Sequence, residues 1–563
     1  MSDRQAGRQT ASAPRAPSAH VDTFARDRLP PPELWPAMPG VQALGYGDRL
    51  NVADLLLDEW VARGLGDRAA LHFPGGRWSF RDLMERSNRI ANVLVDELEV
   101  RPGHRVLLRG PNTPMMIASW FAVLKAGGIC VATMPLLRPR EIGAIADAAA
   151  VSLALCDARV ADDCERARDQ FGSFERIVRF QSEDADGLEA MISRKPATFH
   201  PVATAADDVA LIAFTSGTTG RPKGTLHFHR DLLAICDTYA RHVLRLTPDD
   251  ITCGSPPVAF TFGLGGLVLF PMRVGASSLL LEQGSPAMLL QGIAEHRATV
   301  SFTAPTAYRA MAGMAGSGET SSLRACVSAG EHLPAATFEQ WRAATGIEIL
   351  DGIGSTEMLH IFIGSPPGEV RAGSTGRVVP GYFARVVDAD GVELPAGEVG
   401  HLAVQGPTGC RYLDNEERQR DYVREGWNYP GDSYRRDSEG YFWYQARTDD
   451  LIVSSGYKIP GPEVESALLE HHAVAECGVI GVPDEERGQR VTAFVVLRAG
   501  HDPNGAMVKE LQEFVKAQIA PYKYPRGIEF VASLPRTETG KLQRFRLRDP
   551  RKMLEHRTPE DNT

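Results

Sequence analysis

The run from Thr215 to Gly224 (TSGTTGRPKG) gathers the residue types that bind phosphate: three glycines, four hydroxyl side chains and two cations within ten residues. Glycine permits close backbone approach, hydroxyl and N–H groups can surround phosphate oxygens, and Lys or Arg can neutralise their charge. A flexible surface linker is the alternative, but linkers rarely follow an apolar segment such as 209–214 directly. The run is not a Walker A motif, because Pro222 stands where its second glycine would fall.

Residues 351–357 (DGIGSTE) form a second polar run, in which a glycine-broken loop presents a hydroxyl and a carboxylate. The carboxylate of Glu357 suits Mg²⁺, which prefers oxygen ligands and stays attached to phosphates. Alone this run is weak evidence, because exposed glutamates are common. It becomes specific together with four further loop motifs, at residues 328–331 (SAGE), 429–432 (YPGD), 447–459 (RTDDLIVSSGYKI) and 535–544 (PRTETGKLQR).

Alternating apolar strands and helices must position these motifs. From residue 51 to about 157 this order predicts a mostly parallel sheet covered by helices, and the pattern repeats after Asp231. A β-rich texture extends from residue 373 to about 444. The clearest predicted strands are at 69–73, 105–108, 129–132, 278–281 and 325–328. One helix is predicted to begin after the candidate cap Ser79, and two others cover 113–125 and 286–296.

Beyond a boundary near residues 447–450 the pattern changes to that of a small α+β unit. Helices are predicted at 463–470 and 507–519, and strands at 476–482 and 492–497. We therefore predict an α/β fold class: a large N-terminal domain of layered α/β sheets with a β-rich subdomain, and a small, mobile α+β C-terminal domain. The predicted ranges are 1–30 for a disordered tail, 31–447 for the large domain, 448–555 for the small domain and 556–563 for a second tail.

Length, charge and cysteine content exclude several classes of protein. A chain of 563 residues needs two or more domains, and its net charge of −10 argues against a nucleic acid or an anionic membrane as partner. Eight cysteines without CxxC or zinc spacing indicate buried free thiols in a reduced compartment, so we expect a cytoplasmic protein. Residues 251–272 are uncharged, but prolines and glycines interrupt them, which predicts buried strands and turns rather than a membrane helix.

Taken together, these motifs resemble the adenylate-forming superfamily of acyl- and aryl-CoA synthetases, nonribosomal adenylation domains and luciferases, over about residues 45 to 550. Residues 328–331, 351–362 and 520–526 are most similar to the benzoate-CoA ligase group. Within that group, residues 259–266 (AFTFGLGG) look like 2-aminobenzoate-CoA ligases.

The resemblance implies a two-step reaction with ATP, Mg²⁺ and coenzyme A. A small aromatic carboxylic acid attacks the α-phosphate of ATP to give an acyl-adenylate and pyrophosphate. The acid that the resemblance implies is 2-aminobenzoate or benzoate. The thiol of coenzyme A then attacks the adenylate to give a thioester and AMP. Such transfers depend on positioning and charge neutralisation more than on covalent help from the protein.

By motif match, the resemblance also assigns roles to individual residues. Residues Thr215, Ser216, Gly217, Thr218 and Lys223 would face the β- and γ-phosphates, Thr356 the α-phosphate and Glu357 the Mg²⁺ ion. Gly330, Glu331 and Asp351 would frame the adenine, and Asp432 and Arg447 would hold the ribose. Lys541 would bridge the acid and the α-phosphate, Asp449 would be the hinge between the domains, and Gly456, Lys458, Lys523 and Arg526 would meet coenzyme A. The plain alternatives are a solvated loop lysine for Lys541, a turn carboxylate for Asp449 and ordinary surface cations for Lys458, Lys523 and Arg526.

The acid is expected between the segment around Phe260 and the loop 352–360, with Phe260, Thr261, Phe262, Gly263, Gly352 and His360 as binding residues. Core packing is an equally good explanation for the two phenylalanines, and a satisfied core histidine for His360. No Asp stands near Thr261 to pair with the ammonium group of an α-amino acid, which disfavours amino acids as substrates. We hypothesise that Thr261 lies near a ring substituent such as an ortho amino group.

Other functions remain to be separated from an aryl-CoA ligase. A stand-alone aryl adenylation enzyme would load a carrier protein instead of coenzyme A. A non-catalytic nucleotide-binding module is disfavoured by the presence of Glu357 and Lys541, and a serine hydrolase by the lack of a GxSxG elbow. The sequence leaves a homodimer open.

Overall fold

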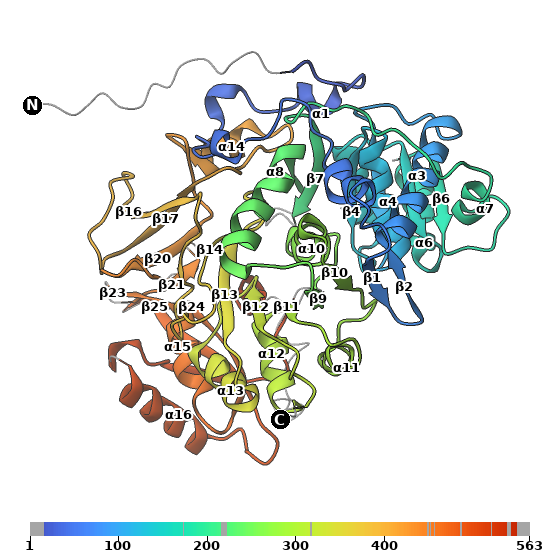
Figure 1. The fold of residues 1–563 in the computed structure, drawn as a ribbon. Helices are drawn as coiled ribbons and strands as arrows, with labels where there is room; N and C mark the ends of the chain where they lie inside the picture. The colour runs from blue at the N-terminus through green and yellow to red at the C-terminus, as the bar shows by residue number, and fades with distance from the viewer. Residues whose placement is uncertain are drawn as a thin grey trace, which may run out of the picture.

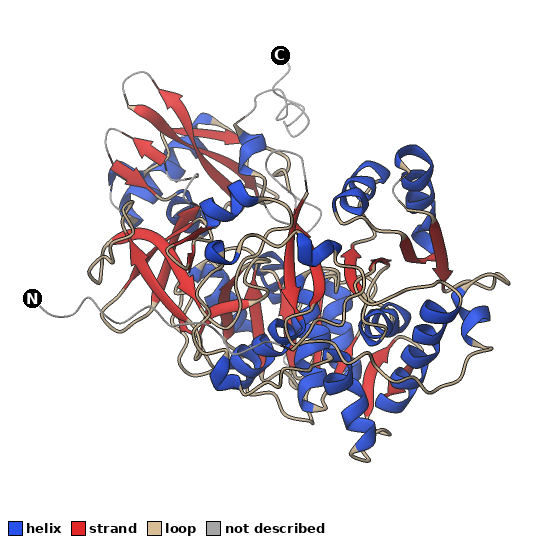
Figure 2. Cartoon of the chain, turned by 90° about the horizontal axis from the view of Figure 1, so that it is seen from above, coloured by secondary structure: helices blue, strands red, loops and turns tan. Residues whose placement is uncertain are grey.

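The structure is a computed structural model that describes residues 16–172, 174–215, 222–315, 318–447, 450, 452–454, 457–484, 487–519, 521–536 and 542–548. Within these residues the strands form four sheets, with helices packed against them (Figure 1). Two larger α/β layers and a β-rich sheet build the body of the molecule, and the fourth sheet belongs to the smaller C-terminal part (Figure 2). These parts confirm the predicted fold class.

The first α/β layer has the strand order β6-β5-β3-β4-β7-β8, and only the β7·β8 pair is antiparallel. Its central strands are buried on both faces, which is why they read as continuous apolar runs. Ser79 caps helix α3 in a capping box with Asp82, as its position predicted. The elements are α3 (Phe80–Asp96), α4 (Pro114–Lys125), α5 (Pro139–Ala148), α6 (Ala161–Phe171), β3 (Arg105–Arg109), β4 (Ile129–Thr133), β5 (Leu153–Asp157), β6 (Arg176–Phe180), β7 (Val209–Thr215) and β8 (Lys223–Phe228).

The second α/β layer is a nine-stranded sheet in the order β15-β14-β13-β12-β11-β9-β10-β1-β2. Strands β9 to β13 run parallel to one another, so their carboxyl ends meet at one edge, whereas β14 pairs antiparallel with β13. The strands are β1 (Ala69–Phe73), β2 (Gly76–Ser79), β9 (Ile251–Gly254), β10 (Ser277–Leu279), β11 (Val300–Thr303), β12 (Ala325–Ala329), β13 (Ile349–Gly354), β14 (Ile361–Gly364) and β15 (Arg377–Val378). The helices are α2 (Glu59–Ala62), α8 (His229–Ile235), η5 (Cys236–Leu244), α11 (Pro286–His296), α12 (Pro305–Ala312) and α13 (Ala335–Thr345).

The β-rich sheet and the small C-terminal part follow in the chain. The small part has its own apolar core, built from strands β22 to β25 and helices α15 and α16. The β-rich part contains β16 (Phe383–Val387), β17 (Val399–Gln405), α14 (Glu416–Tyr422), β18 (Val423–Arg424), β19 (Trp427–Asn428), β20 (Asp432–Arg436) and β21 (Phe442–Arg447). The small part contains β22 (Ile452–Ser454), β23 (Tyr457–Ile459), α15 (Gly461–Leu469), β24 (Val474–Asp484), β25 (Gly488–Leu497), α16 (Gly505–Gln518) and β26 (Gly527–Phe530).

The prediction of strands and turns over residues 251–272 is wrong for its second half, which is helical. Helix α9 (Thr261–Leu264), a π-helical turn η6 (Gly265–Leu269) and α10 (Phe270–Val274) follow one another. A side chain at Gly265 or Gly266 would collide with His360 or Phe302, so packing explains both helical glycines. Pro271 is the second residue of α10, directly after the π-helical turn. No helix of the described residues is long and apolar enough to cross a membrane.

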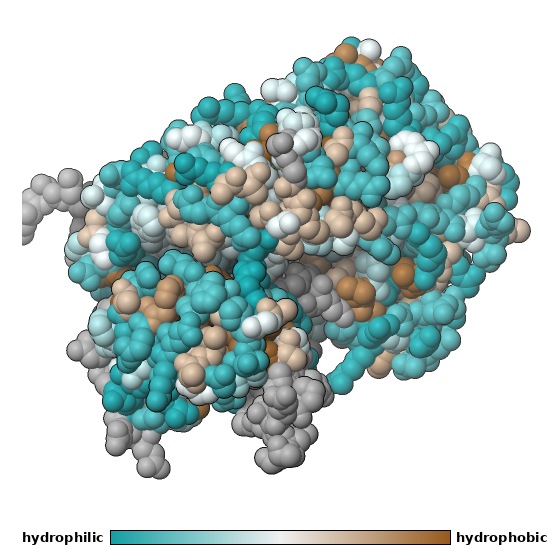
Figure 3. Space-filling view, turned by 90° about the horizontal axis from the view of Figure 1, so that it is seen from below, coloured by the Kyte–Doolittle hydropathy of each residue, from teal (hydrophilic) through white to brown (hydrophobic). Residues whose placement is uncertain are grey.

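Residues 16–30 also differ from the expected disordered tail, because they contact the first layer. Asp208 accepts hydrogen bonds from the Ser18 hydroxyl and, at 2.9 Å, from the Ala19 N–H, and Asp22 pairs with Arg105. Ala25 is fully buried. All eight cysteines are buried and free, as expected. On the face shown in Figure 3, hydrophilic residues predominate and apolar ones occur in small groups.

Candidate active site

A cleft of about 530 Å³ lies at the carboxyl edge of the nine-stranded sheet, between the body of the molecule and the small part. Its size is that of a small-molecule site. Parallel strands bring their carboxyl ends to one edge, which explains why motifs far apart in the sequence meet here. Of the predicted site residues, the cleft is lined by Thr215, Gly330, Glu331, Asp351, Gly352, Thr356, Glu357, Asp432 and Arg447.

One end of the cleft has the planar and acidic groups expected around a nucleoside. Gly330 follows β12 with φ +91°, a conformation that favours glycine, and turns the chain towards Glu331. The rings of His332 and Tyr444 stack at 5.3 Å with an interplanar angle of 26°. Asp432 and Arg447 are cross-strand partners in β20 and β21, and Arg447 Nη1 lies 3.3 Å from Asp432 Oδ1. This end therefore combines a carboxylate, which can accept hydrogen bonds from hydroxyl groups, with a stacked aromatic pair.

Asp351 lies at the floor of this end, and its carboxyl is shielded from solvent. Burial raises the pKa of Asp351 from 3.8 to about 8. The folded chain therefore holds this proton more tightly than the unfolded chain does. The contribution of Asp351 to the free energy of unfolding is consequently largest below about pH 4 and declines as the pH rises towards about 8.

We expect Asp351→Asn to remove this decline, because an amide of similar shape cannot ionise. The variant should gain stability relative to the parent as the pH rises from 5 to 8, by at most about 1.4 kcal/mol per pH unit. Urea unfolding midpoints of both proteins at pH 5 and pH 8 measure the effect. Parallel pH dependence in the two proteins would contradict a protonated Asp351.

The other end of the cleft contains the phosphate-binding candidates. Tyr412 donates a hydrogen bond of 2.6 Å to Glu357 Oε1, which leaves the second carboxylate oxygen for another ligand. His227 Nε2 donates to the Thr356 carbonyl at 2.8 Å, and burial lowers the pKa of His227 to about 4, so the ring is neutral. Lys223 begins β8 opposite Thr215. Burial and the nearby Arg418 lower the pKa of Lys223, while Glu357 raises it.

Two of the acid-binding candidates, Phe262 and His360, belong to an aromatic cluster, whereas Gly352 is the one acid-binding candidate among the described residues that line the cleft. The ring of His360 packs against Phe270 at 4.5 Å, and against Phe262 and Tyr239 at 5.6 Å each. Burial lowers the pKa of His360 to about 3. Its Nε2 donates to the Phe262 carbonyl at 3.4 Å, so Nδ1 is an acceptor, and it has no partner among the described residues.

The segment 260–263 meets this cluster at the start of α9. Phe260 stands just before the helix, and Thr261 is its first residue; both are partly exposed. Gly263 does not offer open space, because an added Cβ would lie 2.2 Å from the Pro257 carbonyl oxygen. Backbone packing is therefore sufficient to explain this glycine.

The small part of the molecule contacts the cleft through an arginine. Arg536 Nη1 lies 3.4 Å from Glu331 Oε1, and its Nη2 lies 2.7 Å from Glu476 Oε2. Arg536 and Leu542, on either side of the segment that includes Lys541, pair with each other and both line the cleft.

The remaining predicted site residues either lie away from the cleft lining or fall outside the described residues. Lys523 is held by Glu463 at 2.5 Å, and Lys458 lies in β23. Ser216, Gly217, Thr218, Asp449, Gly456, Lys541 and the side chain of Lys458 lie outside the described residues.

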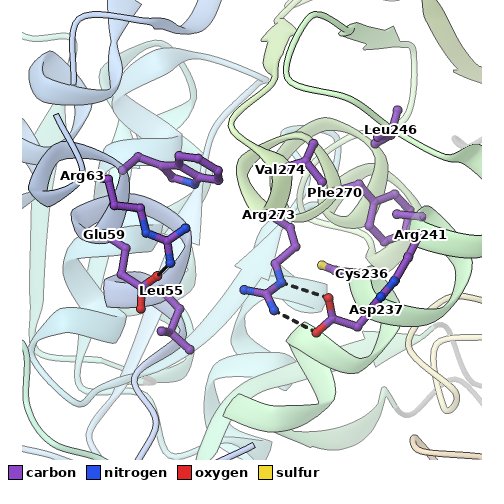
Figure 4. A pocket seen from close by; sticks show the side chains of 12 residues that line it. Leu55, Glu59, Arg63, Cys236, Asp237, Arg241, Leu246, Phe270, Arg273 and Val274 are labelled. Atoms are coloured by element: carbon purple, nitrogen blue, oxygen red, sulfur yellow. Dashed lines mark hydrogen bonds and ion pairs between the residues drawn. The ribbon is translucent and has the colours of Figure 1, made fainter. Parts of the chain in front are cut away.

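A second hollow, of about 420 Å³, lies behind the aromatic cluster, against η5 and α10 (Figure 4). Arg273 points across it to Asp237, with two bonds of 3.0 Å. Phe270 lines this hollow and also contacts His360, so one ring of the aromatic cluster forms part of the wall of the hollow. It contains none of the motif residues.

Sequence reasoning missed several residues that shape the cleft. His332 and Tyr444 carried no signal beyond being aromatic. Tyr412 and His227 reach Glu357 and Thr356 from 55 and 129 residues away in the chain. Arg418 lies in a charged stretch that is typical of a solvated helix face. No spacing rule connects such positions, because sheet pairing brings them together.

The residues present fit ATP and Mg²⁺. Hydroxyls, a carboxylate with an open oxygen and cationic side chains share one end of the cleft, and the stacked pair with Asp432 occupies the other. Mg²⁺ is commonly held by one or two carboxylates together with substrate phosphates, so Glu357 would suffice as its protein ligand.

Comparisons with known proteins give a consistent picture. A family model described as AMP-binding enzyme matches residues 57–411, and one described as AMP-binding enzyme C-terminal domain matches residues 463–541. A benzoate-CoA ligase of Thauera aromatica is 35% identical over 514 residues, covering 90% of this chain and 97% of that protein. The anthranilate CoA ligase AuaEII, solved with anthranoyl-AMP, has a TM-score of 0.85 at 34% identity and covers 91% of this chain and 99% of its own. A benzoate CoA ligase from Burkholderia xenovorans LB400 has a TM-score of 0.82 at 33% identity, with coverages of 89% and 100%.

Proposed function

The chain belongs to the AMP-binding family of adenylate-forming enzymes, in its benzoate-CoA ligase group, and we propose that its acid is 2-aminobenzoate or benzoate. Enzymes of this group are acid-thiol ligases that use ATP and coenzyme A. The proposal concerns the choice of acid, the roles of individual residues and the division of the chain into a large domain (31–447) and a small domain (448–555).

In the proposed first step an oxygen of the acid attacks the α-phosphorus of ATP. The bond between the α-phosphorus and the bridging oxygen breaks, and pyrophosphate leaves. Thr356, and Lys541 from the small domain, would neutralise the charge that develops on the α-phosphate. When bound through Glu357, Mg²⁺ would supply further charge neutralisation at the phosphates.

In the proposed second step the sulfur of coenzyme A attacks the acyl carbon, AMP leaves and the thiol proton passes to solvent. The acyl-adenylate occupies the cleft at this stage, and the thiol must reach its acyl carbon from another side. A rotation of the small domain at Asp449 would accommodate both steps, since a few junction residues can absorb such a motion.

The observation that carries the choice of acid is the neutral, buried His360 within a cluster of aromatic rings. Aromatic walls suit a flat ring, and edge or offset contacts favour it over an aliphatic chain. The acceptor Nδ1 has no partner among the described residues, and an ortho amino group could donate to it. The anthranoyl-AMP bound in AuaEII is chemically of this kind.

A substrate panel tests this proposal. AMP release and thioester formation are measured with free coenzyme A and with benzoate, aminobenzoates, hydroxybenzoates and short fatty acids. We expect thioester from the benzoates and little from the fatty acids. Adenylate formation without any thioester would instead favour an enzyme that loads a carrier protein.

We expect Thr261→Ala to lower the ratio of kcat/KM for 2-aminobenzoate over benzoate by about tenfold, the cost of one lost hydrogen bond. Benzoate lacks the amine and is the internal control for general damage to the site. An unchanged ratio would remove Thr261 from the recognition of the ring substituent and would leave His360 as the remaining candidate.

A further inference from the structure

Arg418 lines the phosphate end of the cleft together with Thr356, Glu357 and Tyr422. It lies in the short helix α14, which is firmly attached to the body of the molecule. Asn415 Oδ1 accepts the Arg418 N–H at 3.0 Å. The next residue, Gln419, is fully buried and bonds the backbone of Tyr412 and Cys410. The base of the Arg418 side chain is therefore fixed beside Glu357.

Among the residues that the structure describes, few groups satisfy the Arg418 guanidinium. Its Nε is shielded from solvent and has no hydrogen-bond partner among the described residues. Its acidic neighbour, Asp421, lies 4.0 Å from Nη1 and is mostly exposed, which makes the pair weak. A shielded N–H donor without an acceptor is costly unless a ligand supplies one.

Two cations approach one carboxylate at this point. Arg418 lowers the pKa of Lys223 while Glu357 raises it, so the three groups are electrostatic neighbours. Two positive charges therefore face one carboxylate in the cleft, and the mostly exposed Asp421 offsets the charge of Arg418 only weakly. An anion with several oxygens relieves both the repulsion between the cations and the unsatisfied Nε, and the planar fork of arginine suits phosphate.

We propose that Arg418 binds the β- and γ-phosphates of ATP, and hence the pyrophosphate that leaves. Arg418 would then be a third cation at the phosphates of ATP, besides the two motif lysines, Lys223 and Lys541. The proposal rests on ATP being a substrate of the proposed reaction, and it does not depend on which acid is used.

Direct binding of three probes, two nucleotides and pyrophosphate, tests the proposal. ATP, pyrophosphate and AMP are titrated calorimetrically into the parent enzyme and into Arg418→Gln, with Mg²⁺ present. We expect the dissociation constants of ATP and pyrophosphate to rise about tenfold or more, while that of AMP stays within twofold because AMP lacks the β- and γ-phosphates. Arg418→Lys should restore part of the loss. Arg420→Gln is the matched control, since Arg420 lies on the same helix but is exposed and paired with Glu416.

Changes below twofold for ATP and pyrophosphate, or an equal loss for AMP, overturn the proposal. Steady-state kinetics give an independent check: the KM for ATP should rise and the KM values for the acid and coenzyme A should not. If the parent enzyme binds ATP but forms no aryl thioester, the proposed function fails while the test of Arg418 still stands. Thermal unfolding of each variant identifies loss of fold.

Discussion

Replacement of Lys541 by alanine is expected to abolish acyl-adenylate formation and to leave thioester synthesis from a supplied aroyl-adenylate largely intact. In the first step two anions, the acid and the α-phosphate, must approach each other, and a lysine between them neutralises both. Loss of one such group in a sheltered site typically costs about 10²- to 10³-fold in rate. In the second step the bond to phosphate already exists, so this neutralisation is no longer needed. Pyrophosphate release measures the first step, and thioester formation from synthetic adenylate measures the second.

The contacts on either side of Lys541 make this test specific. Arg536 bonds both Glu331 and Glu476, and Leu542 lines the same cleft, so the described residues on both sides of 537–541 lie at the site. Lys516→Ala is a suitable control, because Lys516 is a surface residue of the same part of the chain and pairs with Glu513. Pyrophosphate release at the parent rate in Lys541→Ala would refute the assignment. Equal loss of both steps would indicate a role in the structure of the small domain.

Local pattern predicted most of the elements that build this site. Apolar runs of strand length gave β3, β4 and β12, and the capping residue Ser79 gave the start of α3. These elements can be predicted because buried parallel strands are apolar throughout, and because a helix cap depends only on residues next to it in the sequence.

Pattern failed where distant contacts decide the local conformation. Residues 261–274 contain glycines and a proline that indicate turns, yet His360 and Phe302 fill the space beside the glycines and a helix results. Residues 16–30 are polar and proline-rich, yet Asp208 and Arg105 hold them. In both cases the residues that fix the segment lie far from it in the sequence.

The candidate site shows the same division. The motifs predicted Thr356, Glu357 and Asp432 because short polar runs stand out beside apolar strands: the first two follow β13, and Asp432 begins β20. The side chains that orient them were not visible. Tyr412 reaches Glu357 because residues 411–413 lie along β8: Leu226 N–H donates to the Arg411 carbonyl, and Leu413 N–H donates to the Gly224 carbonyl.

This pairing connects the two phosphate motifs mechanically. Strand β8 starts at Lys223, at the end of the glycine-rich run, and Tyr412 beside it holds Glu357 of the second motif. The Tyr412 side chain is almost fully buried, and burial together with the Glu357 charge raises its pKa, so the phenol stays protonated and donates. Lys223 and Glu357 are therefore fixed relative to each other before any substrate binds.

Glu357→Gln is accordingly expected to lower kcat/KM for ATP by about 10²-fold or more and to raise the Mg²⁺ concentration needed for half-maximal rate. The amide keeps the shape of the side chain and an oxygen for the Tyr412 hydroxyl, so the fold should survive, but it removes the charge that suits a divalent cation. Titrations of rate against Mg²⁺ at saturating acid and coenzyme A measure both effects.

Tyr412→Phe separates the charge of Glu357 from its orientation. It should cost about tenfold, the loss of one hydrogen bond to a charged group, and shift the Mg²⁺ requirement in the same direction. Because Tyr412 acts through Glu357, the double variant should be no slower than Glu357→Gln alone, whereas independent roles would multiply the two losses. A parent-like Mg²⁺ requirement in Glu357→Gln would remove this carboxylate from the metal site, and multiplied losses in the double variant would give Tyr412 a role of its own. The cycle therefore tests whether the buried phenol contributes to the reaction only by holding the carboxylate in place.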